Sequence, residues 1–438
     1  MSTLPAILGG RPERTRPYPV PNFMGSEERR LVAEVLDSGV LSDFVAHDGP
    51  SFGGGRMVKA LEAEFCERFG TRFAVSVNSA TSGLHCSLAA ALVGLGHEVI
   101  VPPYTMSATA TTVACLNATP VFADIDARTF CLDVDDVRRK LGPRTKAIVA
   151  VNLFGGPAAL HELRSIADEE GVVLIEDNAQ APGARLQGAW TGTVGHMGVF
   201  SLNCHKTIQC GEGGVVLTND AQLDDRLRLM RNHGEVVQSQ RPTYDVEVEG
   251  LLGYNYRLTE LQAAVALAQV RRLDELTANR IAIAEAITDR LHGIDGLTPA
   301  YVAPDARHVY YLYAIKLDAK RLGLTRPQFK AALDAEGVAC TAGYVKPIYL
   351  YPMYAKSVAQ RREGFGAGIW HPPAGSPVRY ERGICPVTER MYFEELLLTN
   401  ICRADLGPED AFEFVRAIQK VVDNRGAVRD KLLADGIK

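Results

Sequence analysis

The residues best suited to chemistry in this 438-residue chain lie in three short segments. Asn78-Ser-Ala-Thr-Ser-Gly83 is small and hydroxylated, and Glu176-Asp-Asn-Ala-Gln180 carries two adjacent carboxylates. The third segment places Lys206 between Ser201 and a glycine-rich stretch that ends at Gly214. Small residues at a helix N-terminus let backbone N–H groups approach a phosphate. A carboxylate can hold a protonated ring nitrogen or a metal, and a lysine can form a Schiff base with a carbonyl compound.

Each segment also has an ordinary structural interpretation. Residues 78–83 resemble a helix N-cap, and a carboxylate after a strand often caps a turn. Most lysines lie on the surface, where they bind nothing. Taken singly, the three signals are weak, but their order along the chain favours one shared site.

The elements that must position these segments follow from the apolar pattern. Helical spacing predicts helices such as 58–69, 84–95 and 159–170. Short apolar runs predict strands at 73–77, 98–101, 120–124, 147–151, 172–176 and 214–218. Near-continuous apolar strands that alternate with helices are typical of a parallel sheet covered on both faces. In such doubly wound α/β sheets ligands gather at the carboxyl ends of strands, where the candidate residues lie.

Three regions are predicted along the chain. Residues 1–57 form an N-terminal arm and loop, residues 58–294 a large α/β domain, and residues 295–438 a smaller C-terminal α+β domain. A long helical stretch at 259–291 ends the large domain. Within the small domain we expect a strand at 310–316 and helices at 326–336 and 408–422. Glycine-rich or proline-rich composition predicts loops at 49–55 and 354–382.

Bulk composition excludes several classes of function. The net charge is −5 without a dense basic block, so neither nucleic acid nor an anionic membrane is an expected partner. No apolar run reaches 18 residues, and the first residues lack a basic segment followed by an apolar core. Nine cysteines without CxxC pairs indicate reduced thiols rather than disulfides or a metal site. We therefore expect a cytoplasmic protein.

The three segments and their order resemble the DegT/DnrJ/EryC1/StrS family of sugar and aminocyclitol aminotransferases. The resemblance covers about residues 26 to 423. It rests on Ser-Ala-Thr-Ser at 79–82, Glu-Asp-x-Ala-Gln at 176–180, Ser-x4-Lys-x5-Glu-Gly-Gly at 201–214, and Gly-Tyr-Asn-Tyr-Arg-Leu at 253–258. It implies the aspartate aminotransferase-like fold type I and the cofactor pyridoxal 5'-phosphate (PLP).

The resemblance also implies a role for each matching residue. Lys206 would bind PLP covalently, Asp177 would pair with the ring nitrogen, and Gln180 would lie near the 3-oxygen. PLP then acts as an electron sink, and the released lysine amine can carry a proton. The phosphate would be held by Ala80, Thr81 and Ser201, and by Asn255 of a neighbouring subunit. The active unit would be a homodimer with shared sites.

Several positions depart from the family pattern or stay open. Ala80 stands where the family usually has glycine, a mild change if its φ is not positive. Met106 stands where the family often has an aromatic ring over PLP, so it either packs on the ring or fills the core. Arg257 could bind the α-carboxylate of the amino donor through two hydrogen bonds, or it could form an ion pair at an interface. Tyr104 is a further candidate for a substrate contact.

Two neighbours of the lysine have ordinary roles. In a dehydratase branch of the family a histidine replaces the lysine, but the spacing here aligns Lys206, and not His205, with the Schiff-base position. His205 is therefore interpreted as structural. Glu212 in the glycine-rich turn is interpreted as a loop anchor.

The expected function is transfer of an amino group from glutamate or glutamine to a keto sugar or keto-cyclitol, as in antibiotic or glycan biosynthesis. The opening residues 7–16 resemble the leaders of aminocyclitol-type members of the family, and this resemblance implies an inosose-like ketone rather than a nucleotide-linked keto-sugar. A PLP-dependent dehydratase is an alternative, against which the retained Lys206 argues. A PLP-binding regulator is another, against which the lack of a fused basic helix-turn-helix segment argues.

Overall fold

The computed structural model describes residues 3–235, 251–355 and 378–437. Its main body is a seven-stranded sheet in the order β1-β9-β8-β5-β4-β2-β3, in which only β9 runs antiparallel to its neighbours. The strands are β1 Phe73–Val77, β2 Glu98–Val101, β3 Thr119–Phe122, β4 Thr145–Val151, β5 Val173–Asp177, β8 Met197–Ser201 and β9 Gly214–Thr218. The predicted α/β class with a mainly parallel sheet is confirmed, and β8 is the strand that the sequence pattern missed.

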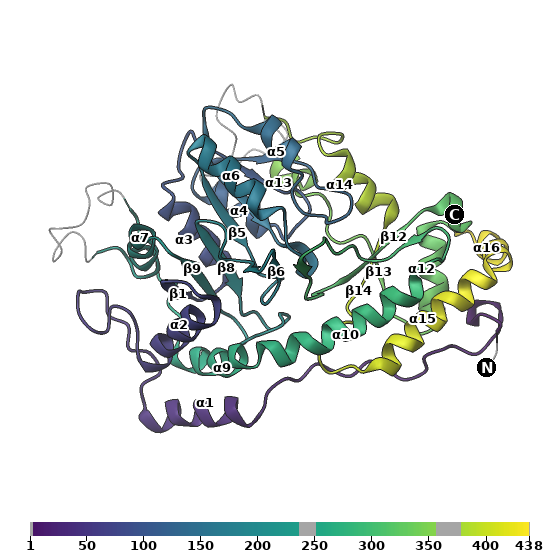
Figure 1. Ribbon diagram of the computed structural model, residues 1–438, viewed down its shortest axis with the longest axis horizontal. Helices are drawn as coiled ribbons and strands as arrows, with labels where there is room; N and C mark the ends of the chain where they lie inside the picture. Colours follow the sequence, from purple (N-terminus) through teal and green to yellow (C-terminus); the bar gives the residue numbers. More distant parts are fainter. Residues whose placement is uncertain (1–2, 236–250, 356–377, 438) are drawn as a thin grey trace, which may run out of the picture.

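Helices cover both faces of this sheet, as Figure 1 shows. One face packs on α3 Ala80–Ala90, α4 Ala108–Cys115 and α7 Ala221–Arg231. The other packs on α2 Arg56–Phe69, α5 Val134–Lys140, α6 Leu160–Glu170 and α9 Glu260–Arg271. Side chains on successive residues of β1 alternate between the two cores, with Val75 in the first and Ala74 in the second. This sheet with its helices is called the large domain below.

A second, antiparallel sheet forms the small domain, in the order β10-β12-β14-β13. Its strands are β10 Leu297–Thr298, β12 Tyr313–Leu317, β13 Thr341–Ala342 and β14 Leu396–Thr399. They pack with α10 Leu273–Leu291, α12 Arg326–Ala335, α15 Pro408–Asp423 and α16 Arg425–Ala434. The helices predicted at 326–336 and 408–422 are present. A domain boundary near residue 295 stays a prediction.

Two predicted elements differ in detail. The helical stretch 259–291 is divided at Arg272, whose backbone leaves the helical region between α9 and α10. The strand predicted at 310–316 begins only at Tyr313, because Tyr310 adopts a left-handed φ of 49° that a strand cannot contain. The described part of the chain also contains short elements: η1 Ala6–Leu8, η2 Leu153–Gly155, β6 Arg185–Leu186, β7 Ala189–Trp190, β11 Ala306–Arg307, α11 Ala319–Leu322, η4 Ile348–Leu350, α13 Pro352–Ala355, α14 Pro386–Arg390 and η6 Met391–Glu395.

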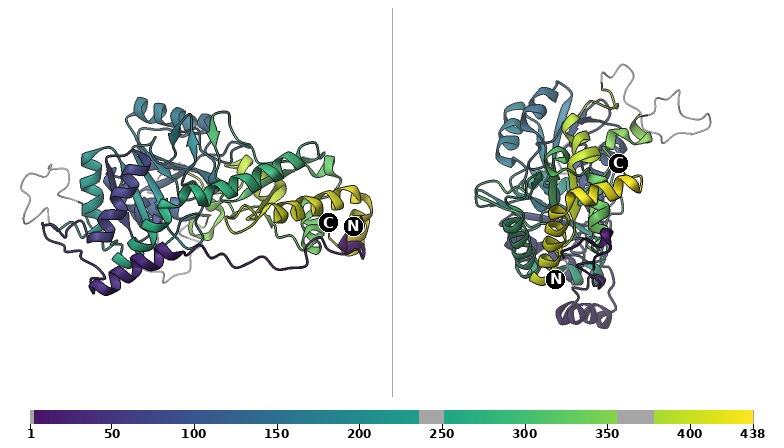
Figure 2. Two further views of the ribbon diagram at one scale, coloured as in Figure 1. Left: turned by 60° about the horizontal axis from the view of Figure 1, so that its bottom comes forward. Right: turned by 90° about the vertical axis from the view of Figure 1, so that its right-hand side faces the viewer.

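The N-terminal arm spans both domains, as Figures 1 and 2 show. It contains a helix that was not predicted, α1 Ser26–Ser38, which packs on α9 of the large domain. Before it, η1 packs on α12 and α16 of the small domain. The buried Glu336 accepts hydrogen bonds from the backbone N–H groups of Ala6 and Glu13 at 2.7 and 3.0 Å. Arg14 forms ion pairs with Asp410 and Glu413 of α15.

The two predicted loops have different outcomes. Residues 49–55 contain neither helix nor strand, as predicted, and Phe52 in this loop is buried. Of the loop predicted at 354–382, residues 356–377 lie outside the described residues. Within the described ranges, every helix falls short of the length and apolarity that crossing a membrane requires.

Candidate active site

The carboxyl ends of the parallel strands bring the three candidate segments to one edge of the large sheet. Asp177 ends β5 and Ser201 ends β8, and both strands are central in the sheet. Gly214, the first residue of β9, pairs with Ser201 on one side and with Val77, the last residue of β1, on the other. The segment after β1, the lysine turn after β8 and the carboxylate of β5 therefore lie side by side, as the sequence predicts.

The two adjacent carboxylates have separate surroundings because consecutive strand residues point to opposite sides. Glu176 is fully buried and accepts hydrogen bonds from the backbone N–H groups of Gly192, Val194 and Gly195 at 2.6, 2.8 and 2.7 Å. The side-chain amide of Asn152 donates a fourth hydrogen bond at 3.1 Å. Glu176 therefore anchors the loop before β8 and has no role that faces the site.

Replacing this anchor is expected to destabilise the fold. Glu176→Leu would leave the three buried N–H groups and the Asn152 amide without an acceptor, which costs about 3–5 kcal/mol in the free energy of unfolding. Urea unfolding followed by circular dichroism measures the change. Glu67→Leu, at an exposed position of α2, is the matched control and should change the stability by less than about 0.5 kcal/mol. Equal stabilities for the two variants would contradict the anchoring role.

Asp177 faces the site. Its Oδ2 accepts a hydrogen bond from the Thr109 hydroxyl at 3.1 Å, and its Oδ1 accepts one from the Ala179 N–H at 3.2 Å. Burial raises the pKa of the Asp177 carboxyl, whereas the Ala179 N–H and the Lys206 charge lower that pKa. A cation placed against this carboxylate would offset the cost of burying it. Asp177 is thus suited to hold a protonated ring nitrogen.

Lys206 is only partly exposed and lies in the turn that follows β8. Burial lowers the pKa of its amine, and the nearby Asp177 charge raises that pKa. The turn is fixed by short-range bonds: Asn203 Oδ1 accepts from the His205 N–H at 3.2 Å, and Asn203 Nδ2 donates to Glu212 at 3.0 Å. Glu212 thus anchors the loop, in line with its interpretation, while the His205 side chain is exposed.

The N-terminus of α3 supplies a place for an anion. Ser79 caps the helix by accepting from the Ser82 N–H at 3.1 Å, which leaves Ala80 and Thr81 in the first turn, where N–H groups lack an intrahelical acceptor. Ala80 is helical and is absent from the residues with positive φ, so the change from glycine carries no backbone strain. A side chain at Gly214 would place its Cβ 2.8 Å from the Ala80 nitrogen. Only a glycine at position 214 therefore allows the buried Ser201, which pairs with it, to lie close to the first turn of α3.

Gln180 is oriented by two fixed partners. Its Oε1 accepts from the Phe154 N–H at 2.9 Å, and its Nε2 donates to the Tyr344 hydroxyl at 3.0 Å. The Tyr344 backbone N–H in turn donates to the Tyr104 hydroxyl at 2.8 Å. Tyr104 has an exposed fraction of 0%, so in this chain its ring and hydroxyl support Tyr344 from beneath. Tyr344 and Thr109 were not identified from the sequence, because each reaches the site only through the tertiary fold.

Three further predicted residues have side chains that are exposed or bonded elsewhere. Met106 has an exposed fraction of 59%, and Asn255 is also exposed, next to the exposed Leu252 and Tyr254. Arg257 donates through Nε to the Asn232 side-chain oxygen at 2.8 Å. Asn232 also donates to the backbone oxygens of Val45 and Phe52, which fixes the glycine-rich loop near this arginine. The roles predicted for Met106, Asn255 and Arg257 stay predictions.

Two curated relatives match most of the chain. The chain is 36% identical over 432 residues to the L-glutamine:2-deoxy-scyllo-inosose aminotransferase of Streptoalloteichus tenebrarius. This alignment covers 97% of this chain and 99% of the relative. The chain is 34% identical over 354 residues to the spore coat polysaccharide biosynthesis protein SpsC of Bacillus subtilis, covering 80% of this chain and 88% of that protein.

Solved structures and a family profile agree with these relatives. The structure of DesI in the presence of its TDP-sugar product has a TM-score of 0.76 at 29% identity, and covers 98% of each chain. An aminotransferase from Psychrobacter cryohalolentis has a TM-score of 0.78 at 28% identity, covering 93% of this chain and 99% of that one. The profile of the DegT/DnrJ/EryC1/StrS aminotransferase family matches residues 25–367. The chain therefore belongs to this family and is an aminotransferase.

Proposed function

We propose that the protein binds PLP at the carboxyl edge of its large sheet and moves an amino group from glutamine or glutamate to the ketone of a cyclitol. The observation that supports this most is the arrangement of three unlike groups that follow or end the strands β5, β8 and β1: the buried Asp177 carboxylate, the Lys206 amine beside it, and the open first turn of α3. These groups match the ring nitrogen, the aldehyde and the phosphate of PLP in charge and chemistry.

Each residue has a defined task in this proposal. Ala80, Thr81 and Ser201 bind the phosphate through N–H groups and a hydroxyl, and the dipole of α3 favours its negative charge. Asp177 keeps the ring nitrogen protonated, and Gln180 orients the ring through its fixed amide. When bound, PLP supplies an electron sink for the negative charge that develops at the donor carbon. The Lys206 amine, whose pKa burial lowers, is suited to accept and return the proton.

The choice of acceptor is supported by the relatives. The relative from Streptoalloteichus tenebrarius acts on 2-deoxy-scyllo-inosose with L-glutamine, according to its name, and it spans nearly the full length of this chain. DesI has a TDP-sugar as its product, so a nucleotide-linked keto-sugar is the alternative acceptor. We favour the keto-cyclitol because the opening residues 7–16 and this full-length relative agree.

The experiment that tests the function follows the two halves of the reaction separately. Purified protein loaded with PLP is mixed with glutamine, glutamate or alanine, and loss of the visible PLP absorbance with gain of pyridoxamine phosphate reports the donor. The pyridoxamine form is then mixed with 2-deoxy-scyllo-inosose or a TDP-linked keto-hexose. We expect glutamine and the inosose to react fastest. Absence of any spectral change with every donor would refute the aminotransferase proposal.

We further propose a homodimer in which Asn255 completes the phosphate site of the partner subunit. Exposed apolar side chains beside Asn255 in the chain, at Leu252 and Tyr254, support a covered surface here. Nine free cysteines, most of them buried, support a reducing compartment such as the cytoplasm.

Mixed dimers test the shared site. Asn255→Ala alone should retain PLP more weakly, and Lys206→Ala alone should be inactive. A dimer with one subunit of each kind, isolated through two different affinity tags, contains one site with both native residues if the sites are shared. We therefore expect about half of the wild-type turnover per dimer, measured with the donor and acceptor above. No recovery above the Asn255→Ala level would argue for sites within single subunits.

A further inference from the structure

A tyrosine from the small domain contacts the reactive lysine of the large domain. The Lys206 Nζ lies 4.7 Å from the centroid of the Tyr311 ring, over its face. A cation in this position is attracted by the negative face of the ring, most strongly where water is excluded. Burial raises the pKa of the Tyr311 hydroxyl, so Tyr311 is a neutral ring at neutral pH. Its interaction with the amine is therefore through the ring face, without a phenolate charge.

The backbone around Tyr311 is held in an unfavourable conformation. Tyr310 has a φ of 49°, and it faces Phe154 and Gly155, whose φ values are 58° and 100°. Left-handed φ is rare for an aromatic residue and persists only where the surroundings enforce it. The Val309 N–H donates to the Gly155 oxygen at 2.8 Å, and the Leu312 N–H donates to the Phe154 oxygen at 3.2 Å. These bonds dock the segment before β12 onto the turn after β4.

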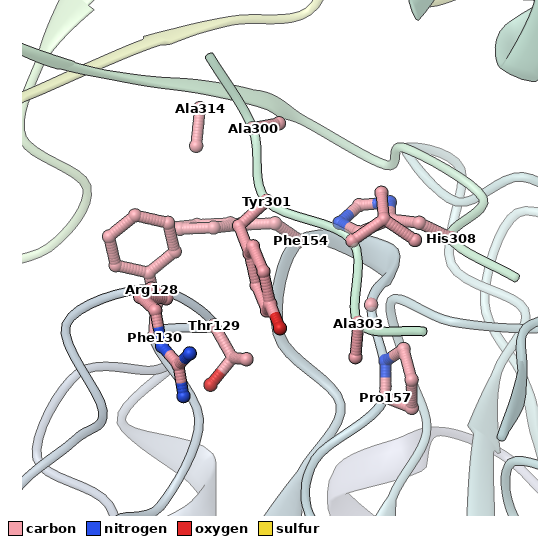
Figure 3. A pocket seen from close by; sticks show the side chains of 12 residues that line it. Arg128, Thr129, Phe130, Phe154, Pro157, Ala300, Tyr301, Ala303, His308 and Ala314 are labelled. Atoms are coloured by element: carbon pink, nitrogen blue, oxygen red, sulfur yellow. The ribbon is translucent and has the colours of Figure 1, made fainter. Parts of the chain in front are cut away.

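Buried side chains enforce this conformation from the other side. His308 Nδ1 accepts from the Tyr310 N–H at 2.9 Å, and burial lowers the pKa of His308 to about 3, so this acceptor is not lost near neutral pH. The buried Arg280 donates to the Tyr310 oxygen at 3.4 Å and to the Cys402 oxygen at 2.7 Å. Figure 3 shows His308 and Phe154 lining one small cavity at this junction. A Cβ at Gly155 would lie 2.7 Å from the Tyr311 nitrogen, so only glycine permits this approach.

We propose that the face of the Tyr311 ring is a positioning group for Lys206, which favours the charged form of the amine and holds Nζ beside Asp177. This inference rests on the proposed role of Lys206. The proposal also gives a reason for the strained backbone at Tyr310, because the segment docked on Phe154 and Gly155 places the Tyr311 ring against the amine. It also explains how a buried amine can hold the proton it accepts, because the ring offsets part of the burial cost. The groups whose charges act on Lys206 or Tyr311 are Asp177, Arg280, Cys204 and Tyr344.

The test measures the amine itself, in full-length protein freed of PLP. Lys206 is acylated with acetic anhydride between pH 6 and 11, and the modified fraction is quantified by mass spectrometry to give the pH midpoint. Tyr311→Phe keeps the ring face and should leave the midpoint unchanged. Tyr311→Leu should lower the midpoint by about 0.4–1.5 pH units, equivalent to about 3–30-fold faster acylation below the midpoint. Tyr311→Met, which keeps more side-chain length, should shift it in the same direction if the leucine variant folds poorly.

Tyr301→Leu provides the matched control. Tyr301 lies on the same small-domain segment, but its ring faces Arg128 at 5.0 Å across the cavity of Figure 3. The Lys206 midpoint should be unchanged in this variant. A raised pH midpoint in Tyr311→Leu would mean that the ring only excludes water from the amine. An unchanged midpoint would mean that the ring does not act on the amine. Either result overturns the proposal. Because the measurement needs no cofactor, a failure of PLP to bind the wild-type protein would refute the proposed function separately.

Discussion

Lys206→Ala is expected to lose covalently bound PLP and to lower turnover by at least about 10³-fold, because one side chain both binds the cofactor and moves the proton. Folding should be retained. The turn that carries the lysine is fixed by Asn203 and Glu212, whose bonds do not involve the lysine side chain. Removing a buried amine also removes the cost of desolvating its charge. Borohydride reduction followed by mass spectrometry measures covalent PLP, and thermal melting measures stability.

A surface lysine gives the control for this variant. Lys330→Ala removes an amine that forms an ion pair with Asp334 on α12, and it should leave PLP binding and turnover unchanged. Methylamine added to Lys206→Ala should restore part of the turnover, since a free amine can then carry the proton. Covalent PLP found on another lysine of the variant would show that the site is assigned wrongly.

Asp177→Asn is expected to slow the donor half-reaction by about 10²–10³-fold, the range seen when one preorganised electrostatic partner is removed from an active site. Asparagine keeps the shape of the side chain: its Oδ1 can still accept from the Ala179 N–H, and its Nδ2 can donate to the hydroxyl oxygen of Thr109. Only the negative charge is lost, so the ring nitrogen of PLP should no longer stay protonated. Stopped-flow absorbance with glutamine measures the rate.

The same variant makes a second, independent prediction about the lysine. Asp177 raises the pKa of Lys206, so its replacement by a neutral amide should lower the pH midpoint of Lys206 acylation in cofactor-free protein. Asp135→Asn, at an exposed position of α5, is the control and should change neither quantity. A half-reaction of wild-type rate in Asp177→Asn would exclude the proposed pairing with the ring nitrogen.

The sequence predicts in part which residues gather at the carboxyl edge of the large sheet, because part of that edge is built from local signals. Asp177 follows a short apolar run that predicts a strand, and parallel strands bring their carboxyl ends to one edge of a sheet. Ser201 and Lys206 follow β8, which the apolar pattern missed, and they are identified from the family motif instead. Ala80 and Thr81 follow from the small residues after β1. The antiparallel direction of β9 is not visible in the apolar pattern, because buried parallel and antiparallel strands are equally apolar.

The contribution of the small domain could not be predicted in this way. Tyr311 and Tyr344 reach the site through the docking of two domains, and no spacing within 300–350 relates them to Lys206 or Gln180. The strained φ of Tyr310 is likewise a tertiary effect, held by His308 and Arg280. Tyr104 follows a strand end as Asp177 does, yet its ring is buried, because Tyr344 packs above it.

The arm before α1 gives the molecule a second connection between its domains, in addition to α10. One end of the arm is bound to the small domain, through the ion pair of Arg14 with Asp410 and the hydrogen bond of the Ala6 N–H with Glu336. The other end is held on the large domain, where α1 packs on α9. A body attached to another at two separated points can rotate freely only about the line that joins them. Swings of the small domain in other directions must stretch the arm or bend α10, so motion between the two domains is restricted to one hinge axis.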